Sequence, residues 1–342
     1  MLEGANRFDA LRLAFATTVF AYHAVALAAL TPGGAWEQAL AQAAELSIQG
    51  FFVISGALVY GSWTRSDGLA DYAGKRFRRL YPAYAVVILA PAALALAMTG
   101  AAGEVARYVA ANLVFLNFLA PELPEWFDDH RFTAVNGALW TLKIEVMFYA
   151  ILPVLAWLMA RLGPGRWMLL AAIYAAAEAW RLGVPRLDVG LTPELAARIA
   201  RQLPGQMSFF AAGVVLWLLR DQARGRAKAL GLAGAGLAAA SFVAAPLEPL
   251  RAAGLACLVA WAAFAPGPAL PAARWGDVSY GVYILHFPVL QALIAAGVFA
   301  VSPLAGLLAA AILVFAAAAL MWRFVERPAL RPASHYRQAS GG

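Results

Sequence analysis

Cysteine is nearly absent from this chain of 342 residues, which has one, Cys257, inside an apolar run. A single cysteine excludes an internal disulfide and any metal site built from several thiolates. Charged residues are also scarce, at 13% of the chain, which is about half of what soluble domains usually carry. Hydrophobic residues reach 63%. This composition excludes an ordinary soluble domain and places the chain in a lipid bilayer.

Linkers rich in Pro or Ser and internal repeats are missing as well. The lack of a repeat counts against a transporter built from two inverted halves. The net charge of +7 does not call for a nucleic-acid partner. The excess Lys and Arg lie in short segments between apolar runs, as the positive-inside rule expects. We therefore expect an all-α, polytopic membrane protein that binds no nucleic acid.

About ten apolar segments are long enough to cross a bilayer as helices. They cover approximately residues 10–30, 44–63, 79–99, 137–160, 166–182, 204–220, 229–245, 250–265, 276–298 and 303–324. A further segment, 105–120, is shorter and contains Asn112 and Asn117, so we expect it to be re-entrant or interfacial. The first segment is interpreted as a retained helix rather than a signal peptide, because many spans follow it.

The distribution of positive charge predicts the orientation. With ten crossings both termini are cytoplasmic, and the basic loop 220–228 faces the cytoplasm, whereas an eleventh crossing would put that loop outside. We expect a membrane domain over residues 1–330, a cytoplasmic tail over 331–342, and the inner (plasma) membrane as the location. The acidic, aromatic outer loop 121–136 is a candidate acceptor contact.

The second outer loop, about 183–203, alternates basic and acidic residues. It is expected to hold a short amphipathic helix from Pro193 onward.

Polar side chains inside apolar segments are the main functional signal, because they are costly in hydrocarbon. Arg12 and His23 are eleven residues apart, about three helical turns, so they share one helix face with Asp9. Their separation along the axis is ~16 Å. We expect His23 to handle a proton near mid-bilayer, with a hydrogen-bonded core histidine as the alternative.

Two further apolar stretches carry hydroxyl and carboxyl groups. Residues 50–56, Gly-Phe-Phe-Val-Ile-Ser-Gly, place glycines where helices can approach closely. Within them Ser55 is either a nucleophile or a hydroxyl bonded to its own helix. Thr141, Glu145 and Tyr149 share a face at intervals of four residues. Glu145 is expected to orient the ring of His23, and a structural ion pair is the alternative.

A basic stretch, residues 75–82, lies at the cytoplasmic end of the third span. Arg76 and Arg79 are three residues apart, so both guanidinium groups can point the same way, and Tyr81 offers a ring for stacking. We expect them to bind the phosphates of a cytoplasmic donor. Anchoring by positive charge alone is the alternative.

A late apolar stretch, residues 279–288, carries Tyr283 and His286 three residues apart. Pro288 lacks an N–H and therefore frees a backbone carbonyl near them. His286 is expected to be a secondary site residue. Nothing in the sequence has the spacing of a metal motif, and no metal is expected.

Together and in this order, these stretches resemble the acyltransferase family 3 of integral membrane proteins. The family's motifs match Asp9, Arg12 and His23; Gly50, Phe51, Phe52, Val53, Ser55 and Gly56; Arg76, Arg79, Tyr81 and Pro82; Trp140, Leu142, Glu145 and Tyr149; Ser279, Tyr280, Tyr283, His286 and Pro288; and Glu326 with Pro328. Thr141 stands where many relatives have Ser, which keeps the hydroxyl.

The resemblance implies O-acyl transfer from cytoplasmic acyl-CoA, usually acetyl-CoA, to a hydroxyl. The acceptor is usually a sugar of an envelope or exported glycan, and otherwise a secondary metabolite such as a macrolide. A transporter or flippase of lipid-linked sugars is an alternative of a different class, and a structural or sensory protein is a third. The expected catalytic residues are His23, Glu145, Arg12 and Asp9; the donor site is expected at Arg76, Arg79, Tyr81, Gly50, Phe51 and Phe52, and the acceptor site at Trp140, Tyr149, Tyr283, His286 and Ser55.

Overall fold

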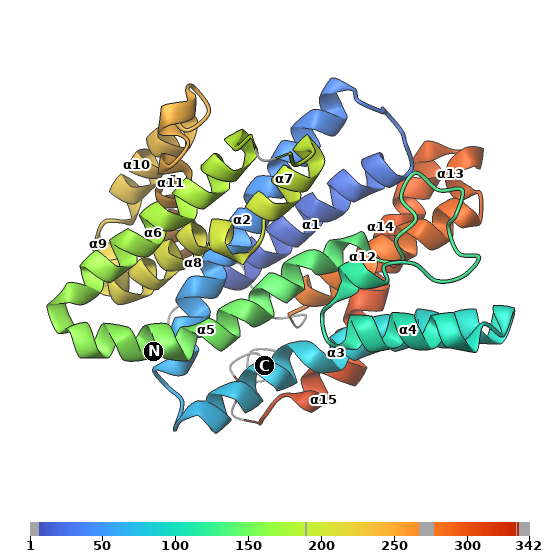
Figure 1. Cartoon of the computed structure of the whole chain (residues 1–342), viewed down its shortest axis with the longest axis horizontal. Coiled ribbons are helices and arrows are strands. Elements are labelled where there is room, and N and C mark those ends of the chain that lie inside the picture. The colour runs from blue at the N-terminus through green and yellow to red at the C-terminus, as the bar shows by residue number, and fades with distance from the viewer. Residues whose placement is uncertain (1–6, 189, 267–276, 333, 335–342) are drawn as a thin grey trace. The chain divides into compact units, whose positions relative to one another are not determined.

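The computed structural model describes residues 7–188, 190–266, 277–332 and 334, so most of the expected tail over 331–342 lies outside the described residues. The described residues form helices and turns without a β-strand, as the sequence predicts (Figure 1).

Each apolar segment expected from the sequence contains a helix. The α-helices are α1 (Phe8–Leu27), α2 (Ala35–Trp63), α3 (Leu69–Thr99), α4 (Ala102–Leu113), α5 (Trp140–Leu162), α6 (Arg166–Gly183), α7 (Pro193–Ala200), α8 (Leu203–Leu218), α9 (Arg220–Gly225), α10 (Ala227–Ala240), α11 (Leu250–Phe264), α12 (Ser279–Ala295), α13 (Val298–Val301), α14 (Pro303–Met321) and α15 (Arg327–Ala329). Short 3-10 turns are η1 (Asn117–Leu119), η2 (Gly137–Leu139), η3 (Gly163–Gly165), η4 (Val184–Arg186) and η5 (Ala245–Leu247). A π-helical turn, η7 (Trp322–Glu326), joins α14 to α15.

Five stretches of the described chain are long and apolar enough to cross a membrane, judged by length and composition. They are Phe8–Leu27, Ala35–Trp63, Leu69–Thr99, Gly137–Arg186 and Pro303–Ala329. The helices α10, α11 and α12 are apolar but shorter. These features fit a membrane protein, and the expected ten crossings stay a prediction.

The chain divides into two compact units. The first comprises Met1–Leu11, Ile48–Ala73 and Ile144–Leu270, and the second comprises Arg12–Ser47, Gly74–Lys143 and Pro271–Gly342. The helices α1, α2, α3 and α5 each contribute residues to both units.

The first unit contains a close helix crossing built on glycine. A β-carbon added to Gly56 on α2 would collide with the carbonyl oxygen of Phe210 on α8. One added to Gly213 would collide with the carbonyl oxygen of Val53. Only residues without a side chain let two helices approach so closely. The prediction of close approach is therefore confirmed for Gly56.

The second unit contains the short segment with the two asparagines. α4 has 12 residues, too few for a span, because a transmembrane helix needs about 20. The Asn112 side-chain amide donates to the carbonyl of Ala120 at 2.7 Å, and Asn117 donates to the Asn112 side-chain oxygen at 2.6 Å. The two asparagines thus hold together the turn that follows α4.

The loop 121–136 is held in place within the second unit. The Arg131 guanidinium pairs with Glu37 at 2.9 Å and donates to the carbonyl of Ala26. In the first unit the predicted short helix in 183–203 is confirmed as α7, where the Thr192 hydroxyl caps the N-terminus by accepting from Leu195 N–H.

Candidate active site

Helix α1 carries Arg12 and His23 in the second unit, three turns apart as the sequence predicts. Both residues are half-buried. Asp9 belongs to the first unit, so its predicted pairing with Arg12 stays a prediction.

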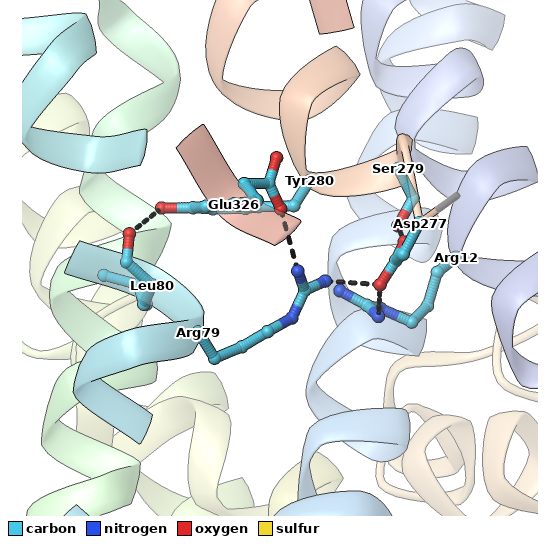
Figure 2. A network of polar contacts seen from close by, with 7 residues as sticks. All are labelled: Arg12, Arg79, Leu80, Asp277, Ser279, Tyr280 and Glu326. Carbon is cyan, nitrogen blue, oxygen red and sulfur yellow. Dashed lines mark hydrogen bonds and ion pairs between the residues drawn. The ribbon is translucent and has the colours of Figure 1, made fainter. Parts of the chain in front are cut away.

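Arg12 ends in a buried cluster of charged residues (Figure 2). Its guanidinium lies 2.6 Å from the Asp277 carboxylate. Arg79, on α3, bonds the same carboxylate oxygen and also bonds Glu326 at 2.8 Å. Figure 2 shows the Arg79 guanidinium between the two carboxylates. The cluster therefore joins α1, α3, the start of α12 and the end of η7.

Asp277 is the centre of this cluster and lies just before α12. Its side chain is 2% exposed and also accepts a hydrogen bond from the Ser279 hydroxyl at 2.5 Å. The guanidinium groups of Arg12 and Arg79 both pair with this carboxylate, and two cations beside it favour its ionised form. Asp277 is therefore an ionised carboxylate at neutral pH.

Glu326 is bonded on one side only. Its Oε2 accepts from Arg79, while Oε1 is buried without a hydrogen-bond partner. Glu326 closes the π-helical turn η7, a rare geometry that appears frequently at functional sites. The sequence pattern singled out Glu326 without a role, and it did not single out Asp277 at all.

The imidazole of His23 pairs with that of His286. The Nδ1 of His23 lies 2.9 Å from the Nε2 of His286, and the rings are stacked with centroids 4.9 Å apart. His286, on α12, is fully buried, and its Nδ1 lies 3.1 Å from the carbonyl oxygen of Val282. The sequence selected both histidines but did not predict that they pair.

The proline on α12 anchors a neighbouring segment. Pro288 cannot donate to the carbonyl of Ile284, four residues earlier, and the Asn136 side chain donates to it instead at 2.8 Å. The Tyr283 and Thr141 hydroxyls are 2.7 Å apart. The predicted free carbonyl is thus confirmed, with Asn136 as a partner that sequence analysis missed.

Ser55 and Glu145 form a pair in the first unit. The Ser55 hydroxyl donates to the Glu145 carboxylate at 2.8 Å, so the structure corrects the expectation that a helical serine bonds its own helix. Tyr149, on the same helix as Glu145, accepts a hydrogen bond from Tyr72 at its backbone carbonyl. The expected action of Glu145 on His23 stays a prediction.

The residues expected to bind the donor differ in accessibility. Arg79 is buried with its guanidinium on two carboxylates, so a phosphate there would have to displace one of them. Arg76 is half-buried. The Tyr81 ring stacks on Phe77 at 4.8 Å, and its hydroxyl donates to the carbonyl of Leu113.

The remaining predicted residues lie on two helices. Gly50 and Phe52 are buried on α2 and Phe51 beside them is half-buried, as is Trp140 at the start of α5. In the described part of the chain no three His, Cys, Asp or Glu side chains come together as a metal site.

Known proteins resemble this chain over most of its length. The family model described as an acyltransferase domain matches residues 6–323. Nodulation protein 10 of Rhizobium leguminosarum bv. viciae is 32% identical over 362 residues, covering 95% of this chain and 93% of that protein. The O-acetyl transferase of Shigella phage Sf6 is 30% identical over 156 residues, 44% of this chain and 45% of that protein. No solved structure matches the chain.

A match of this extent identifies the family, and the apolar helices agree with it. The chain therefore belongs to the acyltransferase family 3 and is a membrane O-acyltransferase.

Proposed function

We propose that this protein moves an acyl group, in the simplest case acetyl, from cytoplasmic acyl-CoA to a hydroxyl of a sugar in an envelope or exported glycan. The observation that carries the proposal is the imidazole of His23. It is half-buried on α1 and hydrogen-bonded through Nδ1, which leaves its Nε2 as the atom to meet a substrate.

His23 acts as the general base in this reaction. Its Nε2 takes the proton of the acceptor hydroxyl while the oxygen attacks the thioester carbon. The tetrahedral intermediate then loses its C–S bond. The departing thiolate takes the proton back from His23, so the products are the ester and the free thiol of CoA.

The donor enters from the side of the cationic residues. Arg12 and His23 are about three turns apart on one helix, ~16 Å, a distance that an extended pantetheine arm can span. Arg76 binds a phosphate of CoA, because it is half-buried and its guanidinium can form charge-assisted hydrogen bonds to phosphate oxygens. The donor's phosphates thus stay near the charged cluster while its thioester reaches the histidine.

The acceptor class rests on the relatives. An O-acetyl transferase and a nodulation protein are among the proteins similar to this chain, and the family's usual acceptors are sugars. An acceptor of the macrolide type would use the same chemistry at His23. A flippase would move a lipid-linked sugar without consuming acyl-CoA.

The test is to supply isotope-labelled acetyl-CoA to membranes that contain the full-length protein. Mass spectrometry then identifies the hydroxyl that gains the label, and a thiol reagent measures the CoA released. His23→Ala should lower the rate by about 10²–10⁴-fold, the usual contribution of a positioned general base. The variant should keep its melting temperature and its yield in detergent.

Tyr84→Phe is the matched control for the loss of a polar group. It removes a buried hydroxyl that donates to the carbonyl of Asn112, a hydrogen bond that involves neither histidine. We expect a lower melting temperature and an unchanged rate. Near-normal transfer by the His23→Ala protein would refute His23 as the base, and label uptake by no hydroxyl would refute the acceptor class.

A further inference from the structure

His286 is the buried titratable group nearest to the proposed base, and it has no place in the chemistry above. It is fully buried, whereas His23 is half-buried. Both ring nitrogens of His286 are engaged, one with the carbonyl of Val282 and the other with His23.

The hydrogen positions in the series Val282, His286 and His23 follow from elementary chemistry. A carbonyl oxygen only accepts hydrogen bonds, so the Nδ1 of His286 carries a hydrogen and donates it to Val282. In a neutral imidazole the other nitrogen is then an acceptor. The Nε2 of His286 therefore accepts from the Nδ1 of His23, which must carry a hydrogen. This leaves the lone pair of His23 on Nε2.

The surroundings of His286 favour its neutral form. Three aromatic rings lie near the His286 ring: the centroids of Phe20, Tyr283 and Phe287 are 5.9–6.5 Å from its own. The ring centroids of Tyr22 and Phe287 lie 5.0 and 5.2 Å from that of His23. A charged imidazolium buried among rings without an ionised partner is costly, so the neutral acceptor is the stable form.

We propose that His286 is a positioning residue that fixes the tautomer of His23 and aims its Nε2 at the acceptor hydroxyl. This inference rests on the proposed function. It assigns to a neutral imidazole the task that a carboxylate performs in the Ser-His-Asp triad, where the third residue holds the histidine tautomer. When His23 becomes imidazolium during transfer, its Nδ1–H donates more strongly to His286, and the proton on Nε2 goes to the leaving thiolate.

The tautomer can be measured without the reaction. The full-length protein is labelled with ¹⁵N-histidine in detergent, and the signal of His23 is assigned as the one that His23→Ala removes. Only four histidines are present, which keeps the spectrum simple. We expect hydrogen on Nδ1 of His23 in the wild type. In His286→Phe we expect a larger share of the hydrogen on Nε2, the tautomer that free histidine favours, although the backbone of Val19 still contacts the ring.

Kinetics supply the second measurement. Phenylalanine keeps a ring in the same volume but offers no acceptor, so His286→Phe should lower kcat by about 10–100-fold. The KM values for acetyl-CoA and acceptor should stay within about threefold, because His286 is fully buried and is proposed to act through His23 rather than in the acceptor site expected from the sequence. His286→Gln can still accept from His23 through its amide oxygen, and it should recover kcat to within about tenfold of wild type.

Each outcome separates this inference from the proposed function. Transfer by His23→Ala at the wild-type rate would overturn the proposed function itself. A wild-type spectrum with hydrogen on Nε2 of His23 would overturn the inference alone, as would a His286→Phe enzyme with normal kcat. Tyr84→Phe serves again as the stability control, since it leaves both histidines in place.

Discussion

Two arginines lie three residues apart on α3, and replacing each of them should have a different effect on the protein. Arg79 is 7% exposed and lies between Asp277 and Glu326, so it holds two buried carboxylates. Arg76 is half-buried at the same end of the helix. The spacing in the sequence does not distinguish the two arginines, whereas the contacts of Arg79 show that it pairs with two buried carboxylates.

Replacing each arginine by alanine tests this distinction. Arg76→Ala should weaken CoA binding by about 10–100-fold, because a charge-assisted hydrogen bond contributes about 1.5–3 kcal/mol. Its melting temperature should be unchanged. Arg79→Ala should destabilise the fold by about 3–5 kcal/mol, since it leaves buried carboxylates without a counter-ion.

Calorimetry of CoA binding and thermal unfolding in detergent are the two measurements. An Arg76→Ala protein with wild-type affinity for CoA would mean that Arg76 does not bind the donor and only contributes to positive-inside orientation. An Arg79→Ala protein as stable as wild type would mean that the cluster in Figure 2 contributes little.

The sequence singled out Arg12, Arg79 and the proposed base His23, but not the residues that the structure pairs with them. Arg12 and His23 follow from helical spacing and from the cost of polar groups in hydrocarbon. Asp277 lies 265 residues from Arg12, and His286 lies 263 residues from His23. Local periodicity carries no information on such pairings, so Asp277 was missed and the histidine pair was not foreseen.

At the scale of the element, α12 is shaped by Pro288. The proline removes the N–H that would satisfy the carbonyl of Ile284, and Asn136 replaces it from the segment before α5. The ring of Phe287 lies against Gly137, where a β-carbon would come within 2.8 Å of it. The segment 136–141 is thus fastened to the helix that carries His286.

A double-mutant cycle tests this element. Asn136→Ala should destabilise the protein by about 1–3 kcal/mol, because it leaves the buried carbonyl of Ile284 unsatisfied. Pro288→Ala supplies the missing N–H within the helix. In that background Asn136→Ala should cost much less, and the coupling between the two sites should exceed about 0.5 kcal/mol.

Thermal unfolding of the four proteins in detergent gives the coupling. Strictly additive effects would show that Asn136 does not substitute for the N–H that Pro288 lacks. The sequence predicted the free carbonyl, since proline chemistry is local, but not the identity of its partner, because that partner lies in a different segment.

Most helices could be read from the sequence, because apolar runs of span length leave few other structures in a bilayer. The expected segment 166–182 corresponds to α6, Arg166–Gly183, and 250–265 corresponds to α11, Leu250–Phe264. The starts of α2 and α3 were missed by about ten residues. Those first turns are polar, with Glu37 on α2 and Asp71 on α3, so hydropathy does not reveal them.

At the scale of the whole molecule, the orientation depends on the short segment that contains α4. If this segment enters the membrane and leaves on the same side, the chain crosses ten times. The loop with Asp129 is then outside and the loop with Arg224 is in the cytoplasm. If the segment crosses, both positions invert. The positive-inside rule favours the first arrangement, because the residues around Arg224 are strongly basic. The length of α4, 12 residues, also favours it.

Single cysteines decide between the two arrangements. In a Cys257→Ser background, Asp129→Cys and Arg224→Cys replace two exposed side chains and should leave folding intact. A membrane-impermeant maleimide should label residue 129 in intact cells and residue 224 only in inside-out vesicles. The reverse pattern would establish eleven crossings. It would leave the donor site in place, because the two topologies diverge only after α4 and both keep Arg76, which precedes it, on the cytoplasmic side.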